Sequence, residues 1–496
     1  MLWRSLNSSK DIGSSKLATE LQRQTTHGVL WHLSEKIGLQ ATRFIVTVIL
    51  ARLLTPADFG LIGMIMVIFA IAQVFVEAGL GSAYIQKKEV SPIDANTIFF
   101  TNLVISALMY ALVWAIAPLV AAFYEEPQLL NLTRVMALIF VINSFGVIQH
   151  SKLRRDVRFK PKAIVNLTAN ITSGALAIYA ALNGVGVWSI AIQFISLNFI
   201  NVVGLWVVVK WMPRLEFSFK SLKEMLSFGI WMLATSILRT ITDNIYILII
   251  GKLFPAAQVG YYTKAKQFQQ MGSEQLSQAI GGVAFPVLAK VQDDEAKIQL
   301  GLNRFLTLSL FMVAPIMLML CMGADAIVYL LLTEKWMPIV PFLRVLSMIG
   351  ILYPLHLINI QLLVSQGQSR LNFRITVVKN LLRIINVVVM VRYGVLFIII
   401  GELIVSLLSL VIITYFTKST VSYGLMRQFW ETRSVWFSIL LSAILGWLST
   451  QLTDDYYFQL ISLFIIIGGS FTAIQYLLNK ELLLDLKDVL LKPKSQ

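Results

Sequence analysis

Charged residues are scarce in this 496-residue sequence. Asp, Glu, Lys and Arg make up 14% of it, 57% is hydrophobic, and the mean hydropathy is +0.75. A typical soluble domain carries about 25% charged residues. The composition therefore excludes a soluble protein and indicates one that crosses the bilayer many times. We attribute the net charge of +15 to basic cytoplasmic loops and not to a nucleic-acid partner.

Residues that carry enzyme chemistry are also few. The single cysteine, Cys321, excludes an intramolecular disulfide, and the four histidines are scattered without metal-binding spacing. No P-loop of the form GxxxxGK[ST] occurs, so no ATPase in this chain supplies energy. We expect no catalytic residue, no metal and no cofactor, and we leave open a coupling ion, H+ or Na+.

Long apolar stretches dominate the chain and predict an all-α integral membrane protein. About 14 stretches reach the roughly 18 residues that a span needs. The polar leader shows no short apolar signal-peptide region, so the first span is expected to be an uncleaved signal anchor. All connections are short, which leaves no room for a separate catalytic domain. The predicted spans are 30–53, 59–84, 97–122, 129–149, 163–183, 185–209, 226–252, 258–288, 303–322, 340–364, 374–391, 394–416, 434–452 and 457–478.

The connections between these spans alternate in charge. Every second connection is rich in Lys and Arg, and those between them are mostly acidic. Because Lys and Arg are retained on the cytoplasmic side, we expect both termini in the cytoplasm. Span 258–288 is the weakest by hydropathy, but omitting it would reverse this pattern in the rest of the chain.

Two stretches 200 residues apart are similar in sequence. Residues 51–60 read ARLLTPADFG and residues 251–260 read GKLFPAAQVG, so that Gly60 corresponds to Gly260 without a gap. Such repeats are typical of transporters built from two halves around a central site; chance similarity between apolar segments is the alternative. The predicted organisation is a leader 1–29, a six-helix lobe 30–209, a connection 210–224, a second lobe 225–417, two extra helices in 434–479 and an amphipathic tail 480–496.

Ionisable residues inside the predicted spans are candidates for function. A charge in the middle of the bilayer costs about 2.5–3.5 kcal/mol, so each one needs a partner, water or a role. Basic groups in a water-filled cleft suit an anionic cargo, because they can replace the hydration of phosphate oxygens. The basic candidates are Lys36, Arg43, Arg239, Lys264, Lys266, Lys379 and Arg383, and the acids, for ion coupling or for structure, are Glu35, Glu77, Asp243, Glu274 and Glu402.

Several of these residues have simpler interpretations. Arg239 and Asp243 are four residues apart and can pair on one helix face. Lys264 and Lys266 lie near a span end and can reach the membrane surface instead of lining a cavity. Lys379 and Arg383 repel each other at the same spacing, so an anion or separate acids must compensate them.

Four sequence motifs resemble a known family: residues 50–61, 77–88, 285–290 (FPVLAK) and 332–336 (LTEKW). They are similar to the Wzx-type polysaccharide flippases, particularly the colanic acid exporter group, in the MOP exporter superfamily that also includes the MATE pumps. The resemblance covers residues 28 to 420. It implies a MOP/MATE-like fold with a central, often cationic cavity. It also implies a place in the bacterial inner membrane, oligosaccharide repeat units on undecaprenyl pyrophosphate as cargo, and alternating access driven by an ion gradient. Partners would be membrane lipids, a polysaccharide polymerase and chain-length machinery.

Two other functions remain as alternatives. A MATE-like cation-coupled multidrug antiporter would need an acidic cavity, whereas the predicted intramembrane charges are mainly basic. A polymerase or ligase acting on lipid-linked sugars would need sizeable outer loops with acid and base groups, and the predicted outer loops are short. We therefore favour the flippase.

Overall fold

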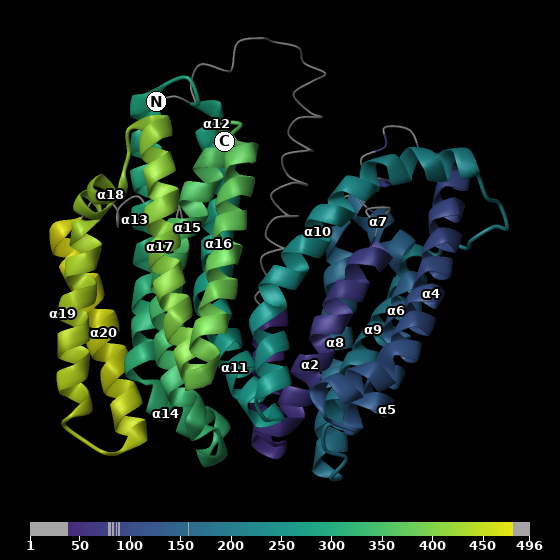
Figure 1. Cartoon of the computed structure of the whole chain (residues 1–496), viewed down its shortest axis with the longest axis horizontal. Coiled ribbons are helices and arrows are strands. Elements are labelled where there is room, and N and C mark those ends of the chain that lie inside the picture. Colours follow the sequence, from purple (N-terminus) through teal and green to yellow (C-terminus); the bar gives the residue numbers. More distant parts are fainter. Residues whose placement is uncertain are drawn as a thin grey trace. The chain divides into compact units, whose positions relative to one another are not determined.

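The structure, a computed structural model, describes residues 38–479 apart from 78–80, 82–83, 86, 88–89 and 157. Side chains at 77, 159, 224–235 and 238 lie outside the description. Throughout the described part of the chain, every regular element is a helix (Figure 1). The predicted all-α membrane fold is therefore confirmed.

The chain divides into two compact units. One comprises Met1–Leu54 with Met64–Asn244, and the other comprises Thr55–Gly63 with Ile245–Gln496. The division passes through α2 (Pro56–Glu77) and α10 (Phe219–Leu253), each of which begins in one unit and continues in the other. The lobe boundaries expected from the spans stay a prediction. Within the expected connection 210–224, α10 already begins at Phe219, because polar and apolar residues continue at helical spacing there.

The first unit contains a helix over residues 38–53, most of α2 and the start of α10. Its α8 and α9 pack side by side along their lengths (Figure 1). The start of α4 is fixed locally, because Ser91 and Asp94 form a reciprocal capping box and Pro92 occupies the first turn. The remaining helices are α4 (Pro92–Tyr124), α5 (Gln128–Met136), α6 (Leu138–Ser144), α7 (Val147–Arg155), α8 (Phe159–Leu182) and α9 (Trp188–Val209).

The second unit is built around α13, α15 and α17, which contribute buried leucines to an apolar core. The pair α19 and α20 packs together beside α13 (Figure 1). Buried polar contacts join the pair, with Gln475 Nε2 donating to Ser438 Oγ at 2.9 Å. The helices are α11 (Ala256–Gln269), α12 (Gln275–Lys290), α13 (Glu295–Met322), α14 (Ala324–Leu332), α15 (Val340–Ser365), α16 (Ser369–Met390), α17 (Val395–Val421), α18 (Leu425–Glu431), α19 (Arg433–Thr450) and α20 (Tyr456–Leu478).

Nine helices of the described chain are long and apolar enough to cross a membrane. A tenth candidate combines Gln128–Ser144 with Val147–Arg155, which meet at an angle of 44°, so the stretch expected as one straight span at 129–149 is bent. The stretch expected at 258–288 is also interrupted, by a π-helical segment over Gln270–Glu274 between α11 and α12. The stretches at 226–252 and 374–391 are helical but are not among these nine helices, and both contain charged residues. The number of fourteen spans stays a prediction.

The two copies of the sequence repeat contact each other within the second unit. Gly60 in the first turns of α2 lies against the carbonyl of Ala256 at the start of α11, and Gly260 lies against the carbonyl of Pro56. A Cβ atom at Gly60 would be 1.8 Å from the Ala256 oxygen, and one at Gly260 would be 1.9 Å from the Pro56 oxygen. This reciprocal contact is typical of a two-fold relation between equivalent elements. It allows the two backbones to cross in direct contact.

Candidate cargo and ion-coupling sites

The predicted site residues are distributed over both units. Lys36 and Glu35 fall in residues 1–37, outside the described residues, as does the side chain of Glu77. The first unit holds Arg43, Arg239 and Asp243, and the second holds Lys264, Lys266, Glu274, Lys379, Arg383 and Glu402. Their functional roles stay predictions, whereas the local geometry of each described residue is defined.

Arg43 belongs to a polar row in the first unit. The Nε of this exposed arginine donates to Asn170 Oδ1 at 3.3 Å. On α8, the Asn170 amide donates in turn to the Asn166 carbonyl at 2.9 Å. Asn201 of α9 donates to Asn166 Oδ1 at 2.6 Å. The row thus combines a guanidinium with three amides, groups that can hydrogen-bond an anion and hydroxyls.

The three asparagines were not expected from the sequence. Asn166 and Asn170 are four residues apart, which places them on one face of α8. That spacing was the available signal, but two amides in an apolar helix indicate packing between helices as readily as a site.

Arg239 and Asp243 form an ion pair on the surface of α10. Their Nε and Oδ2 atoms are 3.5 Å apart, and the side chains are 83% and 55% exposed. This is the simpler of the two interpretations that the spacing allowed. At such exposure the pair contributes about 0–1 kcal/mol, so the contact leaves the guanidinium available to other anions.

Lys264 is buried inside the second unit, with 6% of its surface exposed. Its Nζ lies 3.9 Å from the ring centroid of Phe59 and donates to Gln267 Oε1 at 3.2 Å. The Phe59 ring packs edge-on against Trp336 with centroids 5.5 Å apart. An ammonium over an aromatic face is favourable when water is excluded.

Lys266 and Glu274 follow on the same stretch of helix. Lys266 is half-buried, with its Nζ 5.7 Å from the ring centroid of Tyr262. Glu274 is also half-buried and is the last residue of the π-helical segment. Segments of this kind are frequent at functional sites, which makes this stretch a reasonable place for cargo or ion contacts.

Arg383 and Glu402 form an ion pair between α16 and α17. Arg383 Nη2 and Glu402 Oε1 are 3.6 Å apart, and the side chains are 18% and 13% exposed. The like charges of Lys379 and Arg383 required either an anion or separate acids to compensate them. For Arg383, the compensating group is a separate acid, Glu402. Lys379 is half-buried on the same helix.

Further polar groups on α16 and α17 lie close to this pair in the chain. Asn386, one turn after Arg383, donates from Nδ2 to the Ile398 carbonyl at 3.0 Å and to Tyr246 Oη at 3.2 Å. Gly401 permits the approach, because a Cβ there would be 1.6 Å from Asn386 Oδ1. One turn after Glu402 on α17, Ser406 Oγ lies 3.0 Å from His356 Nε2. Polar groups of α10, α15, α16 and α17 are thus joined by buried hydrogen bonds.

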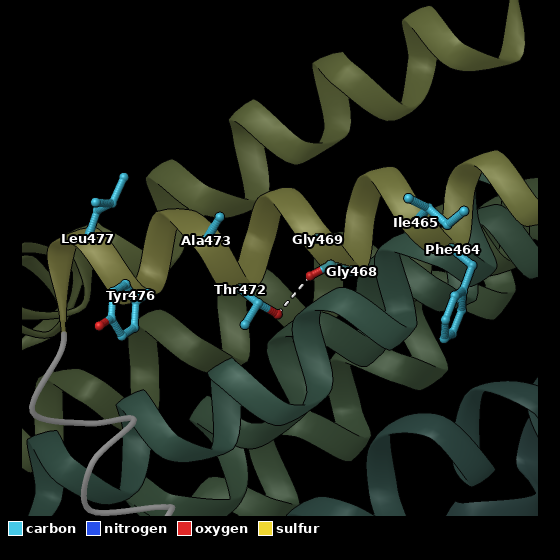
Figure 2. Close-up of a pocket in the computed structure, with 8 residues that line it drawn as sticks. All are labelled: Phe464, Ile465, Gly468, Gly469, Thr472, Ala473, Tyr476 and Leu477. Carbon is cyan, nitrogen blue, oxygen red and sulfur yellow. Dashed lines mark hydrogen bonds between the residues drawn. The ribbon is translucent and has the colours of Figure 1, made fainter.

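The structure also has a shallow hollow of about 780 Å3 along α20. Figure 2 shows its lining as one face of that helix, where Gly468 and Gly469 separate Phe464 from Tyr476. Its lining contains none of the charged residues named above, and it is almost wholly apolar. Apolar surface of this kind on a membrane helix contacts lipid tails or another helix.

Solved structures include proteins of similar fold. Lipid II flippase MurJ in an inward closed conformation matches with a TM-score of 0.76, covering 92% of this chain and 100% of that one, at 15% identity. An inward-facing multidrug resistance MATE transporter of the MOP superfamily matches with a TM-score of 0.59, covering 77% of this chain and 94% of that one, at 14% identity. At such identities the likeness shows the fold alone, which is that of the MOP superfamily.

Sequence relatives define the family. Lipopolysaccharide biosynthesis protein WzxC of Escherichia coli is 24% identical over 429 residues, which are 85% of this chain and 86% of the relative. Succinoglycan biosynthesis transport protein ExoT of Rhizobium meliloti is 25% identical over 333 residues, 67% of each chain. The family model described as "Polysaccharide biosynthesis protein" matches residues 49–341, more than half of the chain.

This protein therefore belongs to the polysaccharide biosynthesis protein family. It is a multi-pass membrane protein of the transporter class, and its resemblance to the Wzx-type proteins of the MOP superfamily is confirmed.

Proposed function

We propose that this protein flips undecaprenyl-pyrophosphate-linked oligosaccharide repeat units across the bacterial inner membrane for polysaccharide synthesis. The observation that carries the proposal is the match to WzxC along 85% of this chain. The protein works by alternating access through a cationic cavity, with both termini in the cytoplasm. It takes the cargo from the cytoplasmic leaflet and delivers it to the polysaccharide polymerase and chain-length machinery outside.

Basic side chains in the helices bind the pyrophosphate of this cargo. Guanidinium and ammonium groups replace water around phosphate oxygens with charge-assisted hydrogen bonds. In the first unit, Arg43 supplies such a group beside the amides of Asn166 and Asn170, which match sugar hydroxyls as donors and acceptors. Arg239 extends the basic set in this unit, and Lys264, Lys266 and Lys379 do so in the other. Lys36, outside the described residues, is a further candidate by its place in the sequence.

A proton gradient drives the cycle through Glu402. This carboxylate is 13% exposed and lies 3.6 Å from a guanidinium nitrogen of Arg383. A positive group at this distance repels Na+, whereas a proton neutralises the carboxylate and releases Arg383 from it. The acids Glu35, Glu77, Asp243 and Glu274 have structural roles in this scheme.

The proposal is tested by deleting the gene in its host and complementing the deletion with the intact gene. We expect one complete repeat unit on undecaprenyl pyrophosphate to accumulate in the deletion strain, as measured by mass spectrometry of extracted lipids, with loss of surface polymer. The intact gene restores both, and Arg43→Ala does not, although the variant protein still inserts. Unchanged polymer and no accumulated intermediate would refute the flippase function.

A multidrug antiporter is the second candidate, because a MATE transporter shares the fold with a TM-score of 0.59. Expression in a drug-sensitive strain distinguishes the two functions. Raised drug resistance without any effect on lipid-linked intermediates would favour the antiporter. Unchanged resistance is the result that the flippase predicts.

Replacing Lys264 by methionine separates its role in folding from its role in transport. Methionine fills a similar volume without the charge, and buried charges carry a large desolvation cost. We expect Lys264→Met to accumulate as folded protein at the level of the wild type while surface polymer falls at least about tenfold, a loss of ~1.4 kcal/mol. Polymer is measured against the complemented deletion strain.

Lys264→Arg serves as the matched control, since it keeps the positive charge, and it should retain part of the transport. Normal polymer with Lys264→Met would show that the ammonium makes no contact with cargo.

A further inference from the structure

The connection between α9 and α10 combines exposed basic and exposed apolar side chains. Residues 210–223, here called the basic segment, contain four basic residues and one acid, a net charge of +3. All four basic side chains, at Lys210, Arg214, Lys220 and Lys223, are exposed. Between them, Leu215, Phe219 and Met212 are 96%, 80% and 72% exposed.

Hydrogen bonds to the first turns of α4 hold the backbone of the basic segment in place. The Arg214 amide donates to Asn96 Oδ1 and the Ser218 amide to Thr97 Oγ1, both at 3.1 Å. Ser221 Oγ also donates to Asp94, in the first turn of the same helix. The exposed side chains are therefore displayed on a fixed backbone.

This position is at a membrane surface. The segment starts where α9 ends and is bonded to the first turns of α4, and both helices are long and apolar enough to span a bilayer. In Figure 1 the connection forms the loop that leads from α9 into the start of α10. Side chains at the end of a span lie at the level of the lipid headgroups. Leucine and phenylalanine exposed there enter the boundary between headgroups and acyl chains.

The charges determine which lipid fits. The single acid, Glu216, accepts from Asn96 Nδ2 at 3.1 Å and so is directed to the protein. Trp211 packs on Phe99 with ring centroids 5.8 Å apart, and Lys152 Nζ lies 5.1 Å from the Trp211 ring centroid, which adds another cation beside the segment. A surface of Lys and Arg around apolar side chains is complementary to anionic headgroups.

We propose that the basic segment is a docking surface for anionic phospholipids, with Lys210, Arg214, Lys220 and Lys223 on their phosphates. Met212, Leu215 and Phe219 enter the leaflet beneath. The segment connects α9 to α10, the helix that continues into the second unit, so lipid binding fixes the start of that helix at the membrane surface. The assignment does not depend on the cargo.

The test uses full-length protein in nanodiscs of phosphatidylcholine, with or without phosphatidylglycerol. In a Cys321→Ser background, Leu215→Cys carries an environment-sensitive fluorophore, and the discs contain lipid with a spin label near the headgroup. We expect phosphatidylglycerol to raise quenching about fivefold, the effect of roughly one phosphate contact. High salt should reverse the increase, because it screens charges at a surface.

Two controls define the outcome. Gln292→Cys is exposed in the short connection between α12 and α13, and its quenching should change less than about twofold. Replacing all four basic residues by glutamine should remove the response at Leu215→Cys. Arg214→Gln alone should weaken it if the fourfold variant does not fold. Equal quenching in both lipids would overturn the proposal, as would absence of quenching in both, which indicates water or a protein partner.

Discussion

Replacing Gly60 or Gly260 by alanine will strongly reduce the amount of this protein that accumulates in a folded form. A Cβ at either position would lie within 2 Å of a backbone oxygen, at 1.8 Å from Ala256 or at 1.9 Å from Pro56. Backbone atoms cannot rotate away as a flexible side chain can, so the starts of α2 and α11 must separate. We expect a loss of about 3 kcal/mol, the upper end for overpacking in a well-packed core. The measurements are the monodisperse fraction in detergent and the melting temperature of the protein in that fraction.

Gly282→Ala is the matched control, because Gly282 also lies within a helix, α12, but a Cβ there meets no atom within 4 Å. Alanine favours a helix over glycine by about 1 kcal/mol, so this variant should be as stable as the wild type or more stable. A Gly60→Ala protein with unchanged yield and melting temperature would contradict the direct crossing of the two repeat copies.

Removing one member of the half-buried pair Arg383–Glu402 will have the second large effect. Glu402→Gln leaves a guanidinium with 18% exposure beside a neutral amide. Breaking a fully buried pair costs about 3–5 kcal/mol, which is the upper limit for this pair. We expect reduced folded protein and, in the fraction that folds, flipping that no longer depends on pH. Flipping of a lipid-linked oligosaccharide in proteoliposomes is measured across an imposed proton gradient.

Two further variants separate folding from coupling. The double variant Arg383→Gln with Glu402→Gln removes both charges, so it should recover stability but not proton-dependent flipping. Asp243→Asn breaks the exposed pair with Arg239 and should change stability by no more than about 1 kcal/mol. If the double variant flips cargo with wild-type pH dependence, the pair is structural and Glu402 is not the coupling acid.

The helical architecture could be predicted because its physical cause is local. Each apolar stretch must satisfy its backbone within the segment once it enters lipid, and the composition around 303–322 or 394–416 permits no other structure. The bend between α6 and α7 and the π-helical segment after Gln269 could not be read from these stretches. Both depend on how neighbouring helices pack, and hydropathy does not record packing.

For the candidate site, the sequence could predict only which charged residues lie in the helices. Lys379 and Arg383 had to be compensated because they share a helix face, which is a local requirement. Three helices must meet before Arg383 can pair with Glu402. The same packing brings Asn386 to Tyr246. The partners are distant in sequence, and spacing along one helix contains no information about them.

The sequence by itself determined the membrane class, the family motifs and the repeat that makes Gly60 equivalent to Gly260, because these follow from composition and residue order. Only the tertiary structure decided that the two glycines touch, that Lys264 lies over Phe59 and that Arg383 pairs with Glu402. The physical reason is that the cost of a buried charge fixes the need for a partner, whereas the packing of distant helices selects which partner it has.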